Sequence, residues 1–381
     1  MEAPAGTVSV HHDSSLLGLT LLRRAELAAR RSGYAKTILL RSDREADREW
    51  GDLTQHEGQR LVVAPVQAVA EVAWLKAAAT VAIPDGGWGG MPGCVAILDS
   101  LTLLEGFAPA DATSGFDALE RHLTGRFGSP TTGLDGWDVV VIRDHRDLSI
   151  ARRRLLRALV KETDGFMARH VERPISIAIS RWLAETPMTP NQVTIVSTAV
   201  GIAGAPFFLS ASPLLQTVGA LLFLTHSILD GCDGELARLK FQESRWGGLL
   251  DFWSDNIVHL SIFSCMALGW AQAEGALWPL LLGAAAVLGA GGSAGFVYWR
   301  LLRDKGGDGP IFTSVSAKQP EMLSRCLDGA ARRDFIYLVL ILALFGKASW
   351  FLALTGIGAP IYLILLLIVA FRDRQRSPAI P

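Results

Sequence analysis

The chain has 381 residues, a formal net charge of -1 and four cysteines without CxxC spacing. The near-zero charge gives no electrostatic reason to expect a nucleic-acid partner, and the cysteine spacing indicates neither a zinc site nor a disulfide framework. Half of the residues are hydrophobic, 19% are charged, and the mean hydropathy is +0.31. This combination is too apolar for an ordinary soluble protein and predicts a soluble region joined to a membrane region.

Residues 1–145 have the pattern of a soluble α/β domain. Short β-branched runs alternate with segments of helical period, which predicts a mainly parallel sheet covered by helices on both faces. The glycine-rich stretch PDGGWGGMPG, residues 84–93, is expected to be a loop. The predicted strands are TVSV (7–10), KTILL (36–40), LVVAP (61–65), TVAIP (80–84), CVAIL (94–98) and DVVVI (138–142).

Residues 146–190 are expected to form a basic linker that ends in a juxtamembrane helix. Within it, residues 174–186 have an amphipathic pattern, with Ile175, Ile179, Trp182 and Leu183 on one side. A helix of this kind is suited to lying in the headgroup layer of a membrane.

Residues 191–381 are dominated by long apolar segments and are predicted to form an all-α domain of six transmembrane helices. Each segment is close to the ~20 residues that cross ~30 Å of hydrocarbon. The fifth is short, and Lys347 either ends it at the far surface or snorkels from within a longer helix. The predicted spans are 192–211, 213–232, 250–270, 277–299, 333–346 and 349–371.

The basic residues that flank these spans predict their orientation. They fall in connections on one side, whereas the connections ASPLL and AQAEGAL on the other side carry none. The positive-inside rule therefore predicts a multi-pass protein of the cytoplasmic membrane with both termini in the cytoplasm. The residues concerned are Arg238, Lys240, Arg245, Arg300, Arg303, Lys305, Arg332, Arg333, Arg372, Arg374 and Arg376.

Four aspartates lie at fixed intervals in LDGCDGELARLKFQESRWGGLLDFWSD, residues 229–255. Asp230 and Asp233 are three residues apart and Asp251 and Asp255 are four apart, so each pair shares one face of a helix. A helical hairpin between the pairs would bring all four carboxylates together. Such a cluster repels itself unless cations neutralise it, and carboxylates without Cys or His in the segment favour Mg²⁺ or Mn²⁺ over zinc.

Small residues and one arginine accompany the aspartates. Gly231, Gly234, Ala237, Gly247 and Gly248 leave space in which a ligand could approach the backbone. Arg238 supplies a planar donor fork that suits phosphate. Metal ligands, space and a guanidinium together indicate a pyrophosphate-containing substrate at the cytoplasmic face.

The pattern D-x2-D-G-x2-A-R-x8-G-x3-D-x3-D resembles the signature of the CDP-alcohol phosphotransferase family at all eight positions, from Asp230 to Asp255. TPNQVT, residues 189–194, resembles that family's entry to its first membrane helix. The resemblance covers residues 150–375. It implies that an acceptor hydroxyl attacks the β-phosphorus of a CDP-linked donor and that CMP is released, as in phospholipid or polyol phosphodiester synthesis.

The same resemblance implies a role for each motif residue. Asp230, Asp233, Asp251 and Asp255 would hold two ions, Mg²⁺ or Mn²⁺, and Asp255 would also act as the base on the acceptor hydroxyl. Gly234, Ala237, Arg238, Gly247 and Thr194 would form the CDP pocket. We expect a homodimer in contact with membrane lipid.

Other interpretations of these residues stay open at this point. The four acids could form a cation-transport site, an ion-binding scaffold or a helix-pairing device, although none of these needs Gly, Ala and Arg at these offsets. His226 and His259 are expected to be hydrogen-bonded interior histidines rather than catalysts. Arg300, Arg303 and Lys305 either bind a phosphorylated acceptor or serve only as positive-inside charges.

The front domain is similar in strand and helix order to the nucleotidyltransferases that are fused to relatives making di-inositol phosphate compounds. However, HHDSSLLG (11–18) stands where a glycine-rich loop is expected, with one glycine, Gly18, and an acidic Asp13. Asp99 is either a remnant metal ligand or a turn former. We therefore expect a degenerate nucleotidyltransferase-like domain, with a bifunctional cytidylyltransferase as the alternative.

Overall fold

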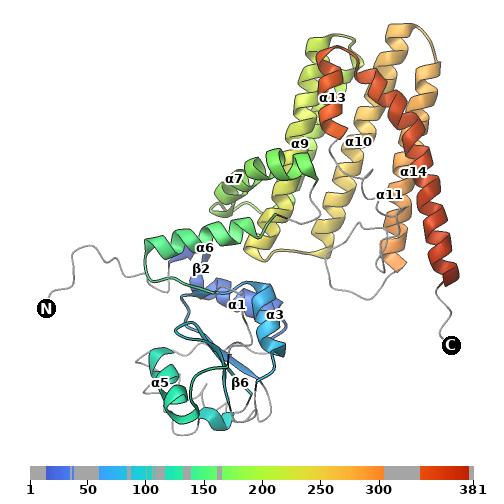
Figure 1. Cartoon of the computed structure of the whole chain (residues 1–381). Coiled ribbons are helices and arrows are strands. Elements are labelled where there is room, and N and C mark those ends of the chain that lie inside the picture. The colour runs from blue at the N-terminus through green and yellow to red at the C-terminus, as the bar shows by residue number, and fades with distance from the viewer. Residues whose placement is uncertain are drawn as a thin grey trace. The chain divides into compact units, whose positions relative to one another are not determined.

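In the computed structural model of the chain, two compact units cover Met1–Ala158 and Leu159–Pro381. The structure describes residues 14–34, 37, 60–83, 87–99, 101–104, 107, 116–131, 139–160, 165–303 and 335–376. The predicted strand at 7–10, nearly all of the one at 36–40, and Asp13 lie outside these ranges. Figure 1 shows the helices and strands of both units.

The first unit is a small α/β domain. Its central strand, β6 (Val95–Leu98), is buried on both faces. Val95 and Ile97 pack toward Trp74 of α3, whereas Ala96 and Leu98 pack toward Leu119 and Leu123 of α5. The other elements are β1 (Ser15–Leu16), β2 (Leu19–Thr20), α1 (Leu21–Arg31), β3 (Leu61–Val63), β4 (Ala68–Val69), α3 (Val72–Thr80), β5 (Gly89–Met91), η1 (Leu101–Leu104), α5 (Phe116–Phe127), β7 (Val140–Val141) and α6 (His145–Arg157).

The prediction of a mainly parallel sheet is not confirmed. Among the described residues, every strand ladder is antiparallel, in the orders β3-β6-β5, β4-β7 and β1-β2, with one isolated parallel bridge between Gly89 and Thr131. The stretch expected to be a loop supplies β5, which turns back onto β6 through Gly93 at φ +70°. Such a hairpin is necessarily antiparallel, and alternation of strand and helix in the sequence does not reveal it.

The strand predicted at 80–84 is not found in its described residues, 80–83. Thr80 ends α3, Val81 caps this helix by donating its N–H to the Ala77 carbonyl, and residues 81–83 have no regular structure. Local β propensity is overridden here by the packing of α3 on β6.

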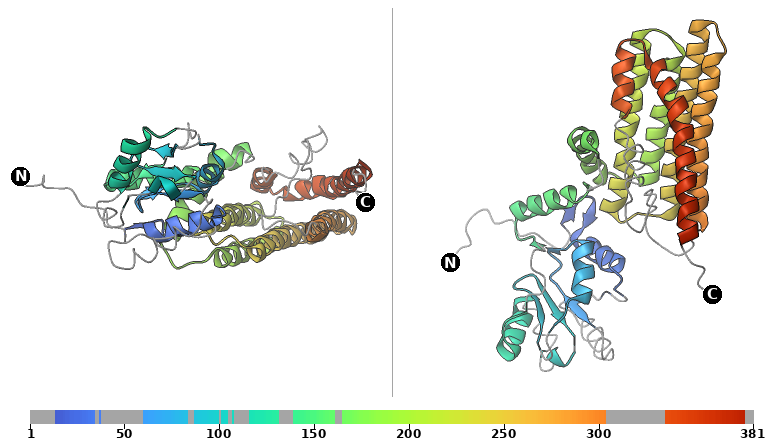
Figure 2. Two further views of the ribbon diagram at one scale, coloured as in Figure 1. Left: turned by 90° about the horizontal axis from the view of Figure 1, so that it is seen from below. Right: turned by 45° about the vertical axis from the view of Figure 1, so that its right-hand side comes forward.

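The second unit is helical. Its helices α8, α9, α10, α11 and α14 run side by side, and α13 packs on α9 (Figures 1 and 2). The elements are η2 (Ala168–Glu172), α7 (Arg173–Ala184), α8 (Pro190–Gly204), η3 (Ala205–Leu209), α9 (Pro213–Lys240), α10 (Arg245–Glu274), α11 (Trp278–Arg303), α13 (Phe335–Leu344) and α14 (Ala348–Arg376).

Within the described residues, four helical segments are long and apolar enough to cross a membrane: Pro190–Leu209, Pro213–Lys240, Trp278–Arg300 and Ala348–Phe371. The predicted count of six is therefore not confirmed. α10 is long enough with 30 residues but carries Asp251 and Asp255, and α13 has only 10 residues. Gly346, at φ +67°, and Lys347 form the turn after α13, so Lys347 ends this helix instead of snorkelling from inside it.

The juxtamembrane prediction over 174–186 corresponds to α7. Ile175 and Trp182 are exposed, as expected for a surface that meets lipid. Leu183 differs from the prediction, because it is buried together with Ser176 and Ser180 on the opposite face, which packs on α9.

Candidate metal centre

A tight turn between α9 and α10 determines where the aspartates lie. α9 ends at Lys240 and is capped by Phe241, whose φ of 56° is left-handed. The Ser244 hydroxyl caps α10 by accepting the Gly247 N–H at 3.0 Å. Asp230 and Asp233 lie near the end of α9, and Asp251 and Asp255 lie near the start of α10. The reversal of direction brings the two pairs to the same end of the bundle (Figure 1).

The structure brings the four carboxylates together in two overlapping groups. Ligand atoms of Asp230, Asp233 and Asp251 lie within 4.8 Å of one another, and so do those of His226, Asp230 and Asp255. Asp230 belongs to both groups. Asp230 and Asp233 are buried and Asp251 and Asp255 are half-buried, so water screens their mutual repulsion poorly. Hard oxygen donors at this spacing fit divalent Mg²⁺ or Mn²⁺.

Thr194 is placed beside the first aspartate pair. Thr189 and Gln192 form a capping box that starts α8 at Pro190, so Thr194 lies in the second turn of that helix. The Thr194 hydroxyl donates to the Asp233 carboxylate, which also accepts the Gly234 N–H. The threonine therefore fixes the rotamer of Asp233.

The small residues predicted for a CDP pocket lie at the same end of the bundle. The nearest side chain that a Cβ on Gly234 would meet is the Arg238 guanidinium, at an ordinary contact distance of 3.6 Å, so this glycine lies beside the arginine one turn on. A Cβ on Gly247 would meet the side chains of Ser244 and Asn191 at 3.0 and 3.1 Å. Gly247 thus allows α10 to approach the start of α8. Ala237 is partly exposed.

Arg300 lies near the end of α11 at this end of the bundle. Tyr298 packs edge to face on Trp253, with ring centroids 5.2 Å apart, and Trp253 lies between Asp251 and Asp255 on α10. Arg300 is two residues beyond that contact and is partly buried. The side chain of Arg303, and Lys305, lie outside the described residues.

A buried glutamate that sequence reasoning did not single out lies inside the motif. Glu235 is fully buried and accepts hydrogen bonds from Arg173 at 2.6 Å and from Ser176 and Ser180 at 2.7 Å each. All three donors belong to α7, so this network fastens the juxtamembrane helix to α9. Gly231, expected beside the ligand, instead lies near Arg173 and Ser176, where an added Cβ would stand 3.6 and 3.9 Å away.

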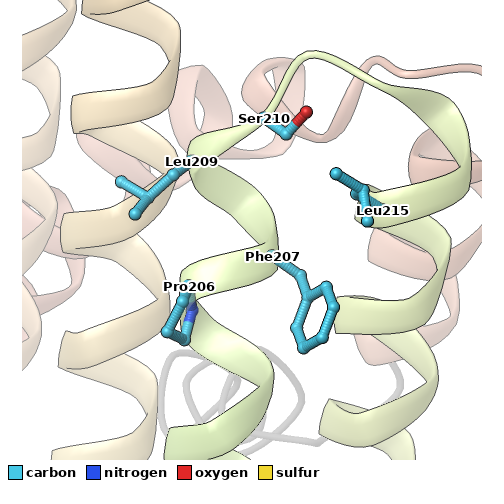
Figure 3. A pocket seen from close by; sticks show the side chains of 5 residues that line it. All are labelled: Pro206, Phe207, Leu209, Ser210 and Leu215. Atoms are coloured by element: carbon cyan, nitrogen blue, oxygen red, sulfur yellow. The ribbon is translucent and has the colours of Figure 1, made fainter.

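An apolar hollow in the helical unit lies far from the aspartates. It has a volume of about 350 Å³ and is lined by Pro206, Phe207, Leu209, Ser210 and Leu215 (Figure 3). Leu215 and Asp230 are separated by fifteen residues of α9, roughly 22 Å at 1.5 Å per residue. The hollow and the carboxylates are therefore at different ends of the helix.

In the front unit, Asp99 has a structural partner. The Arg60 guanidinium donates two hydrogen bonds to the Asp99 carboxylate, at 2.6 and 3.0 Å. It also donates to the Ala78 and Val81 carbonyls. This pairing favours the structural interpretation of Asp99 over that of a remnant metal ligand.

The segment HHDSSLLG ends in a tight hairpin. Leu17 and Gly18, both at positive φ, join β1 to β2, and the buried Arg24 donates to the Leu16 carbonyl at 2.9 Å. Burial lowers the pKa of the Arg24 guanidinium to about 10, so it stays cationic at neutral pH. This cation holds the turn and is buried beneath it.

Part of the helical unit is similar to a known family. Residues 187–318 match the family described as CDP-alcohol phosphatidyltransferase. The second unit, called the membrane unit below, therefore contains a segment that resembles this family. The matched range includes Thr194 and all eight motif positions from Asp230 to Asp255.

Individual relatives of this domain cover only part of the chain. The bifunctional IPC transferase and DIPP synthase of Thermococcus kodakarensis is 39% identical over 137 residues, which are 36% of this chain and 31% of that protein. The phosphatidylinositol phosphate synthase of Mycobacterium tuberculosis is 28% identical over 196 residues, 50% of this chain and 85% of that one. Its crystal structure with CDP-DAG bound superposes with a TM-score of 0.39 at 21% identity, covering 54% of this chain and 96% of that one. The chain thus spans about a third of the length of the bifunctional relatives it matches.

Proposed function

We propose that the membrane unit transfers a substituted phosphate group from a CDP-linked donor to the hydroxyl of an acceptor alcohol. The observation that carries this proposal is the convergence of four aspartates from α9 and α10 beside Thr194 and Arg238. The acceptor oxygen attacks the β-phosphorus, the bond from that phosphorus to the oxygen of CMP breaks, and CMP leaves. The proton of the hydroxyl passes to the Asp255 carboxylate.

Each side chain has a stated task in this reaction. Two divalent ions, held by Asp230, Asp233, Asp251 and Asp255, would offset the charge of the diphosphate and of the departing CMP. Thr194 holds Asp233 in its ligand orientation. Arg238 binds the diphosphate through its planar donor fork, in the space that Gly234 and Ala237 leave. Arg300 and Arg303 are the cations proposed for a phosphorylated acceptor.

The proposed setting is the cytoplasmic membrane, with a six-helix domain, the site and both termini at the cytoplasmic side, and a homodimer in contact with lipid. The four apolar helices and the exposed Ile175 and Trp182 of α7 support a membrane location. In this orientation α7 lies along the same surface from which the donor reaches the aspartates.

Purified full-length protein in detergent should release CMP from a CDP-linked lipid only when an alcohol acceptor and Mg²⁺ or Mn²⁺ are both present. Chelation with EDTA should stop the release, and re-addition of the ion should restore it, because the clustered carboxylates need cations before they can accept a diphosphate. The assay is chromatographic quantification of CMP, with mass spectrometry of the second product. Release that continues in EDTA would contradict the proposal.

The front unit should contribute no nucleotidyl transfer. With Asp230→Asn present to silence the membrane unit, the full chain should release no pyrophosphate from CTP and polyol phosphates. Among the described residues of the front unit, the Leu17–Gly18 hairpin stands in the place of a glycine-rich cradle, and the carboxylate of Asp99 is paired with Arg60. A coupled pyrophosphate assay measures the release. CTP-dependent pyrophosphate release would instead establish a bifunctional cytidylyltransferase and phosphotransferase.

A further inference from the structure

His226 lies one helical turn before Asp230 and faces the second carboxylate group. Its side chain is 1% exposed, and its Nε2 lies 3.6 Å from Oδ1 of Asp255. One nitrogen of this imidazole lies within 4.8 Å of ligand oxygens of both Asp230 and Asp255. Of the two overlapping groups, this is the one that contains a nitrogen.

The other ring nitrogen fixes the tautomer. Nδ1 lies 3.0 Å from the carbonyl oxygen of Ser197 in α8, and a carbonyl can only accept, so Nδ1 carries the proton. The lone pair of the neutral ring is then on Nε2. Gly201 makes this arrangement possible, because a Cβ there would stand 2.9 Å from Cγ of His226. The ring is therefore held between α8 and the carboxylates in one orientation.

Nε2 is buried and has no hydrogen-bond partner among the residues that the structure describes. A nitrogen lone pair directed at two carboxylates is electrostatically unfavourable unless a positive charge lies between them. A histidine that ligates a metal commonly donates its second ring N–H to a backbone carbonyl, as Nδ1 does here.

We infer that Nε2 of His226 is a direct ligand of the divalent ion bound by Asp230 and Asp255. The inference rests on the proposed function and deepens it: one ion has only oxygen ligands, from Asp230, Asp233 and Asp251, whereas the other has a nitrogen ligand as well. A site with an imidazole ligand favours Mn²⁺ relative to Mg²⁺, which prefers oxygen donors.

His259 provides a matched comparison on the other side of Asp255. Its Nδ1 lies 3.9 Å from Oδ2 of Asp255, but its ring packs against Phe223, Phe263 and Phe335. It belongs to neither group of clustered ligand atoms. His259 is thus a histidine near the same carboxylate for which no metal contact is inferred.

The test is pulsed electron paramagnetic resonance of Mn²⁺ bound to tag-free, full-length protein. Directly coordinated imidazole gives electron spin-echo modulation from ¹⁴N, and labelling all histidines with ¹⁵N should replace it by the ¹⁵N pattern. We expect the coupling in the wild type and in His259→Gln and its loss in His226→Gln, with Mn²⁺ affinity about 10-fold lower or more in that variant.

No histidine coupling in the wild type would overturn the inference, and so would a coupling that persists in His226→Gln. The isotope experiment uses unmutated protein, so it shows whether any histidine is a ligand even if His226→Gln does not fold, and persistence of the coupling in His259→Gln then excludes the other histidine beside Asp255. An imidazolium paired with Asp255 would give no such coupling. CMP release is assayed separately. Coupling without CMP release would contradict the proposed reaction but support the assignment of His226 as a ligand. CMP release without coupling would support the reaction and contradict the assignment.

Discussion

Asp230→Asn should reduce CMP release by at least about 100-fold, because loss even of groups that only support metal ligands costs 10- to 100-fold. Asp230 contributes ligand atoms to both carboxylate groups, whereas Asp251 belongs to one and Asp255 to the other. Asp230→Asn should therefore lower the affinity for both ions, whereas Asp251→Asn and Asp255→Asn should each lower the affinity for one ion. The stoichiometry and affinity of Mn²⁺, read from the signal of the free ion in solution, distinguish these outcomes.

Glu274→Gln is the matched control for these variants. Glu274 is exposed at the opposite end of α10, 3.3 Å from the Trp270 indole nitrogen, so the change removes one carboxylate from the same helix without touching the cluster. It should bind two ions and turn over like the wild type. Near-normal CMP release by Asp230→Asn at saturating Mg²⁺, or a full complement of two tight ions, would show that the cluster is not the metal centre.

The gathering of the aspartates could be predicted because the motif is local. Offsets of three and four residues put each pair on one helical face, and a short turn joins the two helices that carry the pairs, so a helical hairpin is enough to bring them together. Thr194 could be proposed only through the family resemblance. Nothing in the spacing between residues 194 and 233 shows that the Thr194 hydroxyl of α8 donates to Asp233. That contact depends on how α8 packs on α9.

His226 is a buried histidine hydrogen-bonded to a backbone carbonyl, as expected, but the direction in which its ring points, like the partners of Glu235, could not be predicted for a similar reason. A histidine before an acidic motif is usually an ordinary interior residue, and its orientation here depends on a backbone carbonyl of α8 and on the missing side chain of Gly201. The motif specifies no residue at position 235, between Gly234 and Ala237. The hydrogen-bond partners of Glu235 lie about sixty residues earlier, in α7. Contacts between distant segments leave no periodic trace in the sequence.

The direction of the strands in the front unit was not predicted correctly, for a different reason. β-branched runs separated by helical segments are typical of parallel sheets, but the described ladders are antiparallel. In one of them, β5 with β6, the added strand is Gly89–Met91, and its glycines carry no strand signal. The burial of β6 on both faces, by contrast, followed from its unbroken apolar run, CVAIL.

Glu235→Ala should destabilise the membrane unit by about 3–5 kcal/mol, the usual cost of removing one partner from a buried ion pair. The change would leave a cavity beside the Arg173 guanidinium, whose side chain is only 14% exposed. It would also remove the carboxylate that accepts hydrogen bonds from Ser176 and Ser180. Thermal unfolding of the purified full chain in detergent, followed by circular dichroism, should show a lower melting temperature. Glu274→Ala, which removes an exposed carboxylate, should melt like the wild type.

The paired change Arg173→Leu with Glu235→Leu separates charge pairing from packing. Replacing both partners by apolar groups of similar volume is often neutral for stability, so the double variant should regain most of the loss. The aspartates lie roughly 140–200° around α9 from Glu235, at 100° per residue. The folded fraction of Glu235→Ala should consequently release CMP at close to the normal rate below its melting temperature. If the double variant is as stable as the wild type and yet inactive, the Arg173–Glu235 pair does more than fasten α7, and the seating of α7 on α9 is part of what shapes the metal centre.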